Sequence, residues 1–197
     1  MTTVTQMRPA MGMWPLTGMM VESFPEPSAV IGAAFEELEA AAAEPEATDE
    51  DLQRMVSLPR PWDPGTCPPH LRRHVWNWCD QVAEWINTQH LWKTNRPGIP
   101  ACWPAHPHIA HDLPVLACAR FLAGFATTPT PLEEWHHYTL PGFLDRLVDR
   151  LGDGCQPGRH MRAPRAPRND AFLFDGEVAG RAQRFASDAA GEAPAHR

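Results

Sequence analysis

One stretch of this sequence constrains the fold more than any other, the segment from His70 to about His90. Its large apolar residues recur three or four positions apart, which is the spacing of one helix face: Leu71, Val75, Trp78, Val82, Trp85 and Ile86. Pro68 and Pro69 come just before it, and proline is favoured at a helix start, where the first amides lack partners anyway. The stretch predicts a long amphipathic helix with one buried face.

Two later segments also have helical spacing. The first begins at His106-Pro107 and carries these apolar residues along one side: Ile109, Leu113, Leu116, Ala117, Leu122 and Phe125. Pro114 lies inside it and predicts a kink or a restart, since proline removes a helical hydrogen bond. The second begins at Thr130, which together with Glu133 predicts a capping box.

The apolar residues of this last segment span a break at Pro141-Gly142 and are Leu132, Trp135, Phe143, Leu144, Leu147, Val148 and Leu151. Before it, the connection 95–105 is rich in proline, which forbids helix and leaves Trp103 to be buried by a loop. The prediction is an all-α fold, a small bundle of three main helices. Two of these helices are expected to be kinked at proline.

Composition places these helices in one domain with flanking arms. The chain has 197 residues, and most of its 22 prolines lie at the ends or between the helical segments. We predict that residues 1–26 are disordered, that 27–66 form an acidic arm with one or two short helices, and that 67–155 form the helical core domain. Residues 156–197 are then a basic proline- and arginine-rich tail, with a weak terminal helix from about Gly176.

The net charge of -7 hides a separation of charge along the chain. Residues 21–51 contain no lysine or arginine and hold the acidic residues Glu22, Glu26, Glu36, Glu37, Glu39, Glu44, Glu46, Asp49, Glu50 and Asp51. A helix predicted over the run from Ser28 to Glu44, with Val30, Ala34 and Leu38 four residues apart, either docks on the core or stays free. A second short helix is expected to begin at Thr48, whose hydroxyl can cap the amide three residues on.

The basic tail has its own regular pattern. Arg159, Arg162, Arg165 and Arg168 recur every third residue among prolines. A polyproline II helix has three residues per turn, so this spacing would place the four guanidinium groups along one edge. Such an edge can contact phosphates of a nucleic acid in a salt-dependent way, and a solvated tail is the alternative reading.

Two pairs of cysteine and histidine bracket the predicted domain, Cys102 with His106 and Cys155 with His160. Structural zinc takes four such ligands in a tetrahedron, so the pairs resemble two half-sites. The alternative is that the cysteines pack as small apolar residues and that His106 starts a helix. Apart from zinc, the pattern predicts no cofactor.

Features that the sequence lacks bear on the cellular compartment and on the expectation of catalysis. Five cysteines without paired spacing indicate reduced thiols and a cytoplasmic protein. Arg120 and several prolines interrupt the most apolar stretch, so no membrane-spanning helix is expected. No phosphate loop, nucleophile elbow or paired-carboxylate signature is present, and we therefore expect no enzymatic activity.

The region from about residue 100 to 160 resembles a family designated domain of unknown function 4913. The residues that carry the resemblance are Trp103, His106, Pro107, Leu113, Leu116, Trp135, Leu144, Leu147, Gly152, Cys155 and His160. Members of that family are typically small actinobacterial proteins, many of them encoded on plasmids, integrative elements and phages, and they have no established activity. The resemblance implies helical packing and a mobile-element setting.

The combined interpretation is a non-enzymatic accessory or adaptor protein, encoded on a mobile genetic element, that binds an unidentified protein or contacts nucleic acid through its tail. The acidic arm would either cover the basic tail or engage a basic partner. Two alternatives stay open. One is a structural or assembly protein that works through protein contacts only, and the other is a small zinc-supported domain.

Overall fold

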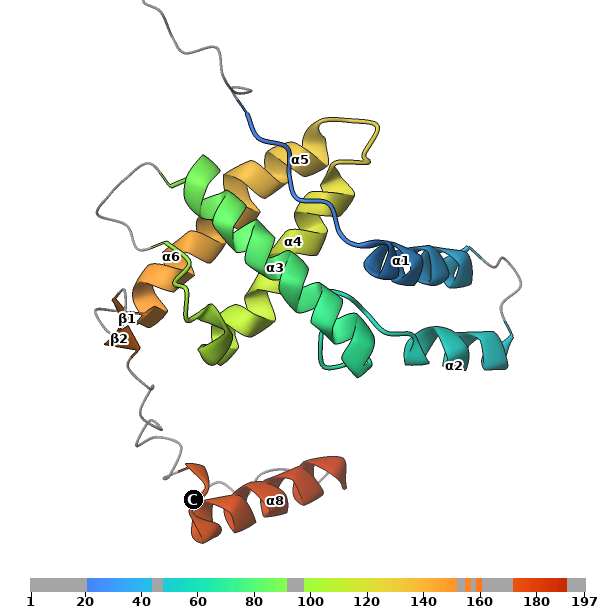
Figure 1. Cartoon of the computed structure of the whole chain (residues 1–197). Coiled ribbons are helices and arrows are strands. Elements are labelled where there is room, and N and C mark those ends of the chain that lie inside the picture. The colour runs from blue at the N-terminus through green and yellow to red at the C-terminus, as the bar shows by residue number, and fades with distance from the viewer. Residues whose placement is uncertain are drawn as a thin grey trace, which may run out of the picture. The chain divides into compact units, whose positions relative to one another are not determined.

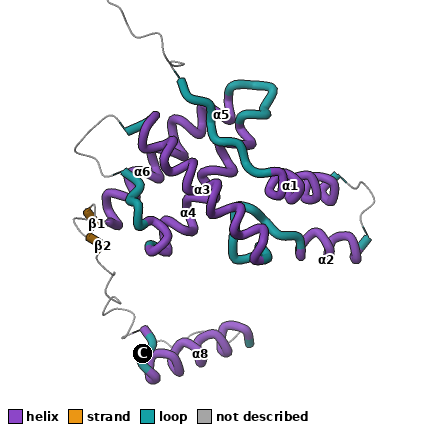
Figure 2. Tube along the Cα trace, viewed as in Figure 1, coloured by secondary structure: helices purple, strands orange, loops and turns teal. Residues whose placement is uncertain are grey.

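In a computed structural model the chain forms two compact units, residues 1–152 and 153–197, and each unit is described by itself (Figure 1). The residues that the structure describes are 21–43, 48–91, 98–151, 155–156, 159–160 and 172–190. Over these residues the helical fold class is confirmed, and a few short extended pairings are also present (Figure 2).

The longest helix of the first unit is α3, Pro69–Gln89, which confirms the helix predicted from His70 to His90. All six residues of the predicted stripe are buried, and Cys79 and Ala83 are buried with them. Pro68 occupies the N-cap position and Pro69 the first turn, as the sequence predicts.

Helix α4, Pro107–Ala123, begins after His106 as predicted and continues through Pro114 without a restart. The kink at Pro114 stays a prediction. Leu122 and Phe125 were expected on the buried side, but both are exposed, and Phe125 keeps 72% of its surface. The reason is helical geometry, because Ala123 continues the buried stripe while Leu122 lies one position off it and Phe125 lies beyond the helix end.

The last helical rod of this unit consists of α5 (Thr130–Glu134), the π-helical turn η2 (Trp135–Thr139) and α6 (Leu140–Leu151). The capping box expected at Thr130 and Glu133 is wrong, because Pro129 is the N-cap and its carbonyl accepts from the Glu133 amide at 2.9 Å. The break expected at Pro141-Gly142 lies instead at η2, where the Leu140 amide donates to the Trp135 carbonyl five residues back.

Proline explains the position of this wide turn. Pro141 has no amide hydrogen and its ring would collide with the carbonyl four residues earlier in a regular helix. A single π turn accommodates both effects. The chain therefore stays helical from Thr130 to Leu151, with a change of pitch where sequence reasoning expected two pieces.

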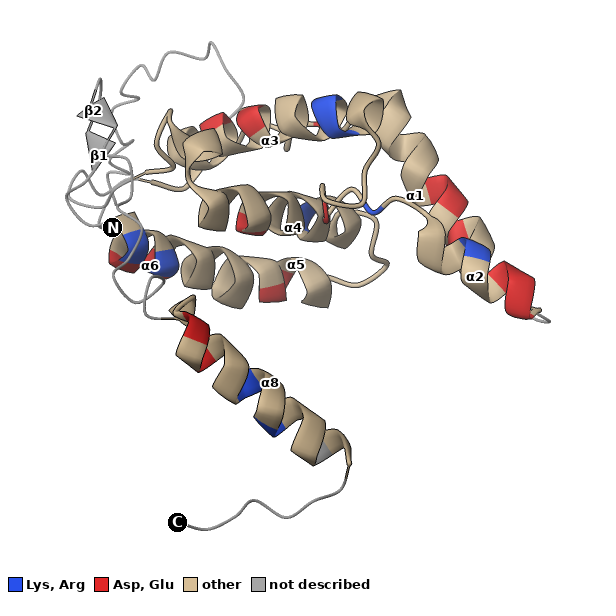
Figure 3. Cartoon of the chain, turned by 90° about the horizontal axis from the view of Figure 1, so that it is seen from below, with Lys and Arg blue, Asp and Glu red and all other residues tan. Residues whose placement is uncertain are grey.

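These helices stack in the order α3, α4 and the α5–α6 rod (Figure 3). Helix α4 contacts α3 on one side and η2 and α6 on the other, so it is the centre of the core. Trp103 is buried, as predicted, but it lies in a 3₁₀ turn, η1 (Trp103–Ala105), where the prolines were expected to forbid helix; this turn connects the loop after α3 to α4.

Helix α1, Ala29–Ala42, docks on α3, which answers the question that the sequence left open. Its buried residues are Ile31, Ala34 and Phe35, whereas the expected face was Val30, Ala34 and Leu38. Helix α2, Asp49–Ser57, follows, and Thr48 caps it as predicted by accepting from the Asp51 amide at 3.2 Å. Figure 3 marks the acidic residues along α1 and α2.

Residues 21–28, here called the N-terminal segment, pack against α3, although positions up to 26 were expected to be disordered. The indoles of Trp78 and Trp85 donate to the carbonyls of Pro25 and Glu22, at 2.8 and 3.1 Å. The Phe24 ring meets both indoles edge-on, with centroids 6.3 and 5.1 Å away. A buried indole needs an acceptor for its N–H, and this segment supplies one for each. Residues 1–20 lie outside the described residues.

The second unit contains a two-stranded antiparallel hairpin, β1 (Cys155–Gln156) and β2 (Arg159–His160), and helix α8 (Asp175–Ala189). Helix α8 lies where the weak terminal helix was predicted. Among the helices that the structure describes in either unit, none has the length and apolarity needed to cross a membrane.

Candidate functional site

A surface pocket of about 390 Å³ lies where α3 meets η1 and the first turns of α4. We call it the tryptophan pocket. It is lined by Trp76, Asn77 and Asp80 of α3, Trp103 and Pro104 of η1, and Ala110 of α4. Its volume is within the range of small-ligand and side-chain binding sites, which are usually apolar with a few polar groups.

The two tryptophan rings form a corner of this pocket. Their centroids are 5.8 Å apart and their planes are tilted by 58°. Trp103 is only 3% exposed, whereas Trp76 is half-buried at the surface of α3. The Trp103 indole donates to Asp80 Oδ1 at 3.0 Å, which fixes the orientation of both the ring and the carboxylate.

The loop that carries Trp103 is anchored to α3 at its other end. Asn87 donates from Nδ2 to the Ile99 carbonyl at 2.9 Å and accepts from the Ile99 amide at 2.8 Å. The Trp103 amide in turn donates to the Pro100 carbonyl at 2.8 Å. The pocket walls are therefore a helix and a loop tied to that helix, which is a preorganised arrangement.

The predicted pair Cys102 and His106 flanks η1, on either side of the turn that carries Trp103. Cys102 Sγ lies 3.4 Å from His106 Nε2, so the structure brings these two residues together. His106 is buried, and its ring meets that of His108 edge-on at 5.6 Å. Among the residues that the structure describes, no group of three or more metal-ligating side chains is found.

The other predicted site residues lie in the second unit. Cys155 and His160 are direct partners in the register of the β1–β2 hairpin, and Arg159 lies in β2 opposite Gln156. For these hairpin residues the structure describes the backbone and not the side chains. Arg162, Arg165 and Arg168 lie outside the described residues.

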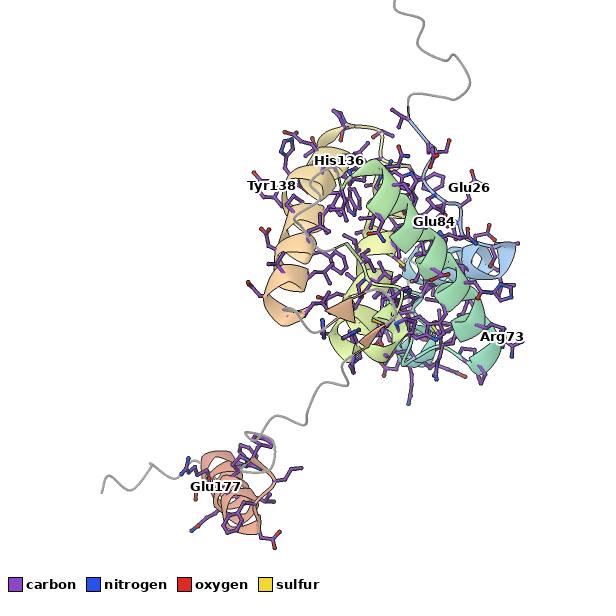
Figure 4. The ribbon with its side chains drawn as sticks, turned by 60° about the vertical axis from the view of Figure 1, so that its left-hand side comes forward. Glu26, Arg73, Glu84, His136, Tyr138 and Glu177 are labelled. Carbon is purple, nitrogen blue, oxygen red and sulfur yellow. The ribbon has the colours of Figure 1, made fainter. Side chains whose placement is uncertain are left out.

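A second polar cluster lies at the junction of α3, α4 and η2. The Arg120 guanidinium carbon is 5.1 Å from the Phe24 ring centroid and 5.8 Å from that of Trp135. The His90 ring lies 5.9 Å from Trp135 and 5.5 Å from the ring of His136, which Figure 4 labels at the surface of η2. Burial lowers the pKa of His90, and the neighbouring charges of His136 and Arg120 lower it further.

This cluster has the properties of a structural contact. Arg120 Nε and His90 Nε2 are buried, have no hydrogen-bond partner among the described residues, and are surrounded by aromatic rings. Cation–π attraction to Phe24 and Trp135 stabilises the guanidinium there. The cluster therefore joins the N-terminal segment to the wide turn η2.

The buried cysteines lack the environment that activates a thiol. Burial raises the pKa of Cys118 to about 12, and burial also raises the pKa of Cys79 and of Cys67. A nucleophilic cysteine needs a lowered pKa and a nearby base. Cys79 and Cys118 are therefore packing groups in the interface between α3 and α4.

Sequence reasoning missed the tryptophan pocket, although it singled out its neighbour Cys102. Neither Trp76 nor Asp80 is among the site residues that the sequence predicts. The available signal was that Trp76 and Asp80 lie four residues apart on α3 and both lie beside the apolar stripe, so they share a face at the edge of the core.

Comparison of the chain with known protein families, with curated proteins and with solved structures finds no match. The resemblance to the domain of unknown function 4913 therefore stays a prediction from the residues.

Proposed function

We propose that this chain is a cytoplasmic accessory or adaptor protein that acts by binding a partner protein, without catalysis, and that the tryptophan pocket receives a side chain of that partner. The observation that carries the proposal is the pocket itself, with Trp76 and Trp103 in its wall. Tryptophan is enriched among the residues that dominate binding energy at protein interfaces. A largely apolar hollow with a rigid rim suits one anchoring side chain.

A peptide array tests this proposal with two forms of the chain. Wild type and Trp76→Leu are applied to the same library of short peptides, and we expect a set of peptides that wild type retains and Trp76→Leu loses. Phe125→Leu is the matched control, because Phe125 is an exposed aromatic residue away from the pocket. If Trp76→Leu retains the same peptides as wild type, the pocket is not the binding site and the proposal fails.

A zinc-supported domain is the second candidate, and the four predicted ligands Cys102, His106, Cys155 and His160 carry it. The 3.4 Å approach of Cys102 Sγ to His106 Nε2 supports one half of the set. The other half is supported by the hairpin register, in which Cys155 and His160 are partners. Both spacings suit a tetrahedral ion with sulfur and nitrogen ligands.

Elemental analysis of untagged, chelator-washed protein tests the zinc candidate. We expect about one zinc per chain and a marked loss of thermal stability after stronger chelation, since structural zinc binding is coupled to folding. Protein without metal and without a thermal shift would leave the four residues as packing and capping groups.

The setting on a mobile genetic element and the contact of the arginine-rich tail with nucleic acid stay part of this proposal. Binding of fluorescent duplex DNA at rising salt tests the tail, because phosphate contacts weaken steeply with salt. Binding that is absent at low salt would favour the alternative of an assembly protein that uses protein contacts only.

A further inference from the structure

The charged side chain in the wall of the tryptophan pocket is acidic. Of the described residues that line it, Asp80 is the one ionisable group, and neither lysine nor arginine is among them. Asp80 is exposed on α3, so its carboxylate faces water as well as the pocket. A ligand group that enters here meets a carboxylate and the electron-rich ring of Trp76, which is half-buried at the surface.

Tryptophan rings attract cations more strongly than other side-chain rings do. The ring face carries negative potential, and it attracts an ammonium or guanidinium group that lies within about 6 Å of the centroid. Trp76 presents such a ring at the surface, and the buried ring of Trp103 packs against it with the two centroids 5.8 Å apart. A neighbouring carboxylate adds Coulomb attraction to the same ligand.

Asp80 keeps acceptor capacity for a ligand. Its Oδ1 accepts the Trp103 indole hydrogen at 3.0 Å, and a carboxylate offers about four acceptor positions in all. The same hydrogen bond holds the carboxylate beside the rings, so the charge does not have to be positioned when the ligand arrives. This is the preorganisation that raises affinity without new contacts.

The tilt of the rings distinguishes between kinds of cation. Guanidinium is planar and stacks best on a parallel aromatic face, whereas an alkylammonium head is compact. Planes tilted by 58° form a corner and not a parallel slot. A corner suits a compact head whose alkyl stem lies along an apolar wall, here Pro104 and Ala110.

We propose that the tryptophan pocket binds the side-chain ammonium group of a lysine in the partner protein, with Trp76 contacting the cation, Asp80 neutralising it and the buried Trp103 holding Asp80 in place. This inference rests on the proposed function, which supplies the protein partner. It adds that the partner must present a lysine side chain to the pocket. Pro104 and Ala110 contact the alkyl stem of that lysine.

The test follows the indole N–H signal of Trp103 in ¹⁵N spectra of the full chain. The probes are a blocked Gly-Lys-Gly tripeptide, its uncharged norleucine counterpart, its arginine counterpart and choline. The norleucine peptide matches the lysine stem and lacks the charge. We expect the lysine peptide to bind about fivefold to tenfold more tightly than the norleucine peptide, as the cation–π and Coulomb contributions imply.

Two variants separate the ring from the charge. Asp80→Asn keeps an oxygen acceptor for the Trp103 indole and removes the negative charge, so it should weaken the lysine peptide about threefold to fivefold and leave the norleucine peptide unchanged. Trp76→Leu should weaken the lysine peptide about tenfold. Glu84→Gln is the matched control, one turn further along α3 and exposed (Figure 4), and it should change neither.

Several outcomes would overturn the inference. Equal affinity for the lysine and norleucine peptides means that the pocket is an apolar site, and tighter binding of the arginine peptide or of choline means that the cation is of another kind. In each of these cases the array experiment can still show a partner peptide lost by Trp76→Leu, so the proposed function survives. If the array also shows no dependence on Trp76, both proposals fail.

Discussion

Replacing Phe24 by alanine tests how firmly the N-terminal segment is held on the core. The Phe24 ring packs edge-on against Trp85 at 5.1 Å and against Trp78 at 6.3 Å, and the Arg120 guanidinium lies 5.1 Å from its centroid. A truncation to alanine removes all three contacts at once. It leaves the indole hydrogen bonds to the segment's carbonyls in place, because these use backbone atoms.

The expected loss follows from burial and geometry. Truncation of a fully buried phenylalanine to alanine costs about 3–5 kcal/mol, and Phe24 is half-buried, which reduces the packing contribution to about 2 kcal/mol. Edge-to-face and cation–π contacts add about 0.5–1 kcal/mol. We therefore expect Phe24→Ala to lower the free energy of unfolding by about 2–3 kcal/mol, which corresponds to a fall in Tm of about 5–10 °C.

Urea unfolding measures this loss. The signal to monitor is far-ultraviolet circular dichroism and not tryptophan fluorescence, because a change beside Trp78 and Trp85 alters the fluorescence directly. The matched control is Phe125→Ala, whose ring is 72% exposed and meets Phe121 at 4.8 Å. We expect it to lower the free energy of unfolding by less than about 1 kcal/mol. A loss in Phe24→Ala no larger than in this control would refute the idea that the segment is part of the folded core.

Two further predictions concern titration. Burial lowers the pKa of His90, His108 and His136 below their ordinary 6.5, so the unfolded chain binds more protons just below that pH and the free energy of unfolding should fall as pH drops through about 6.5. Urea unfolding at a series of pH values checks the sign, and greater stability on acidification in this window would contradict it. Burial raises the pKa of both Cys79 and Cys118, so thiol reagents at about pH 8 should modify these two residues only after unfolding. Mass spectrometry of native protein treated with the reagent checks this, and a label on either residue would contradict the prediction.

Local sequence pattern predicted the elements whose stability comes from one buried face. Helix α3 is an example, because a stripe of apolar residues at helical spacing must be covered, whatever covers it. The pattern does not say what the polar atoms of that stripe bind. The indole of Trp78 bonds the carbonyl of Pro25, 53 residues earlier in the chain, and nothing near either residue indicates that pairing.

The candidate site also contains one contact that the sequence pattern predicts and one that it does not. Cys102 and His106 are close because one turn of chain separates them, and their spacing predicted this contact. The tryptophan pocket arises where a loop returns to α3, since Trp103 and Asp80 are 23 residues apart. A site that depends on loop closure cannot be derived from periodicity, whereas a site within one turn can.

The wide turn η2 also sets the angular phase of the rod that contains it. In a regular α-helix five residues turn the chain by about 500°, so Trp135 and Leu140 would point about 140° apart. The hydrogen bond from the Leu140 amide to the Trp135 carbonyl closes one turn over those five residues, and both side chains are buried. The turn acts as a one-residue phase correction between two apolar stripes. A chain that lacked one residue between 136 and 139 would have Trp135 and Leu140 four positions apart, so a regular α-helix could turn both stripes toward α4 without the wide turn.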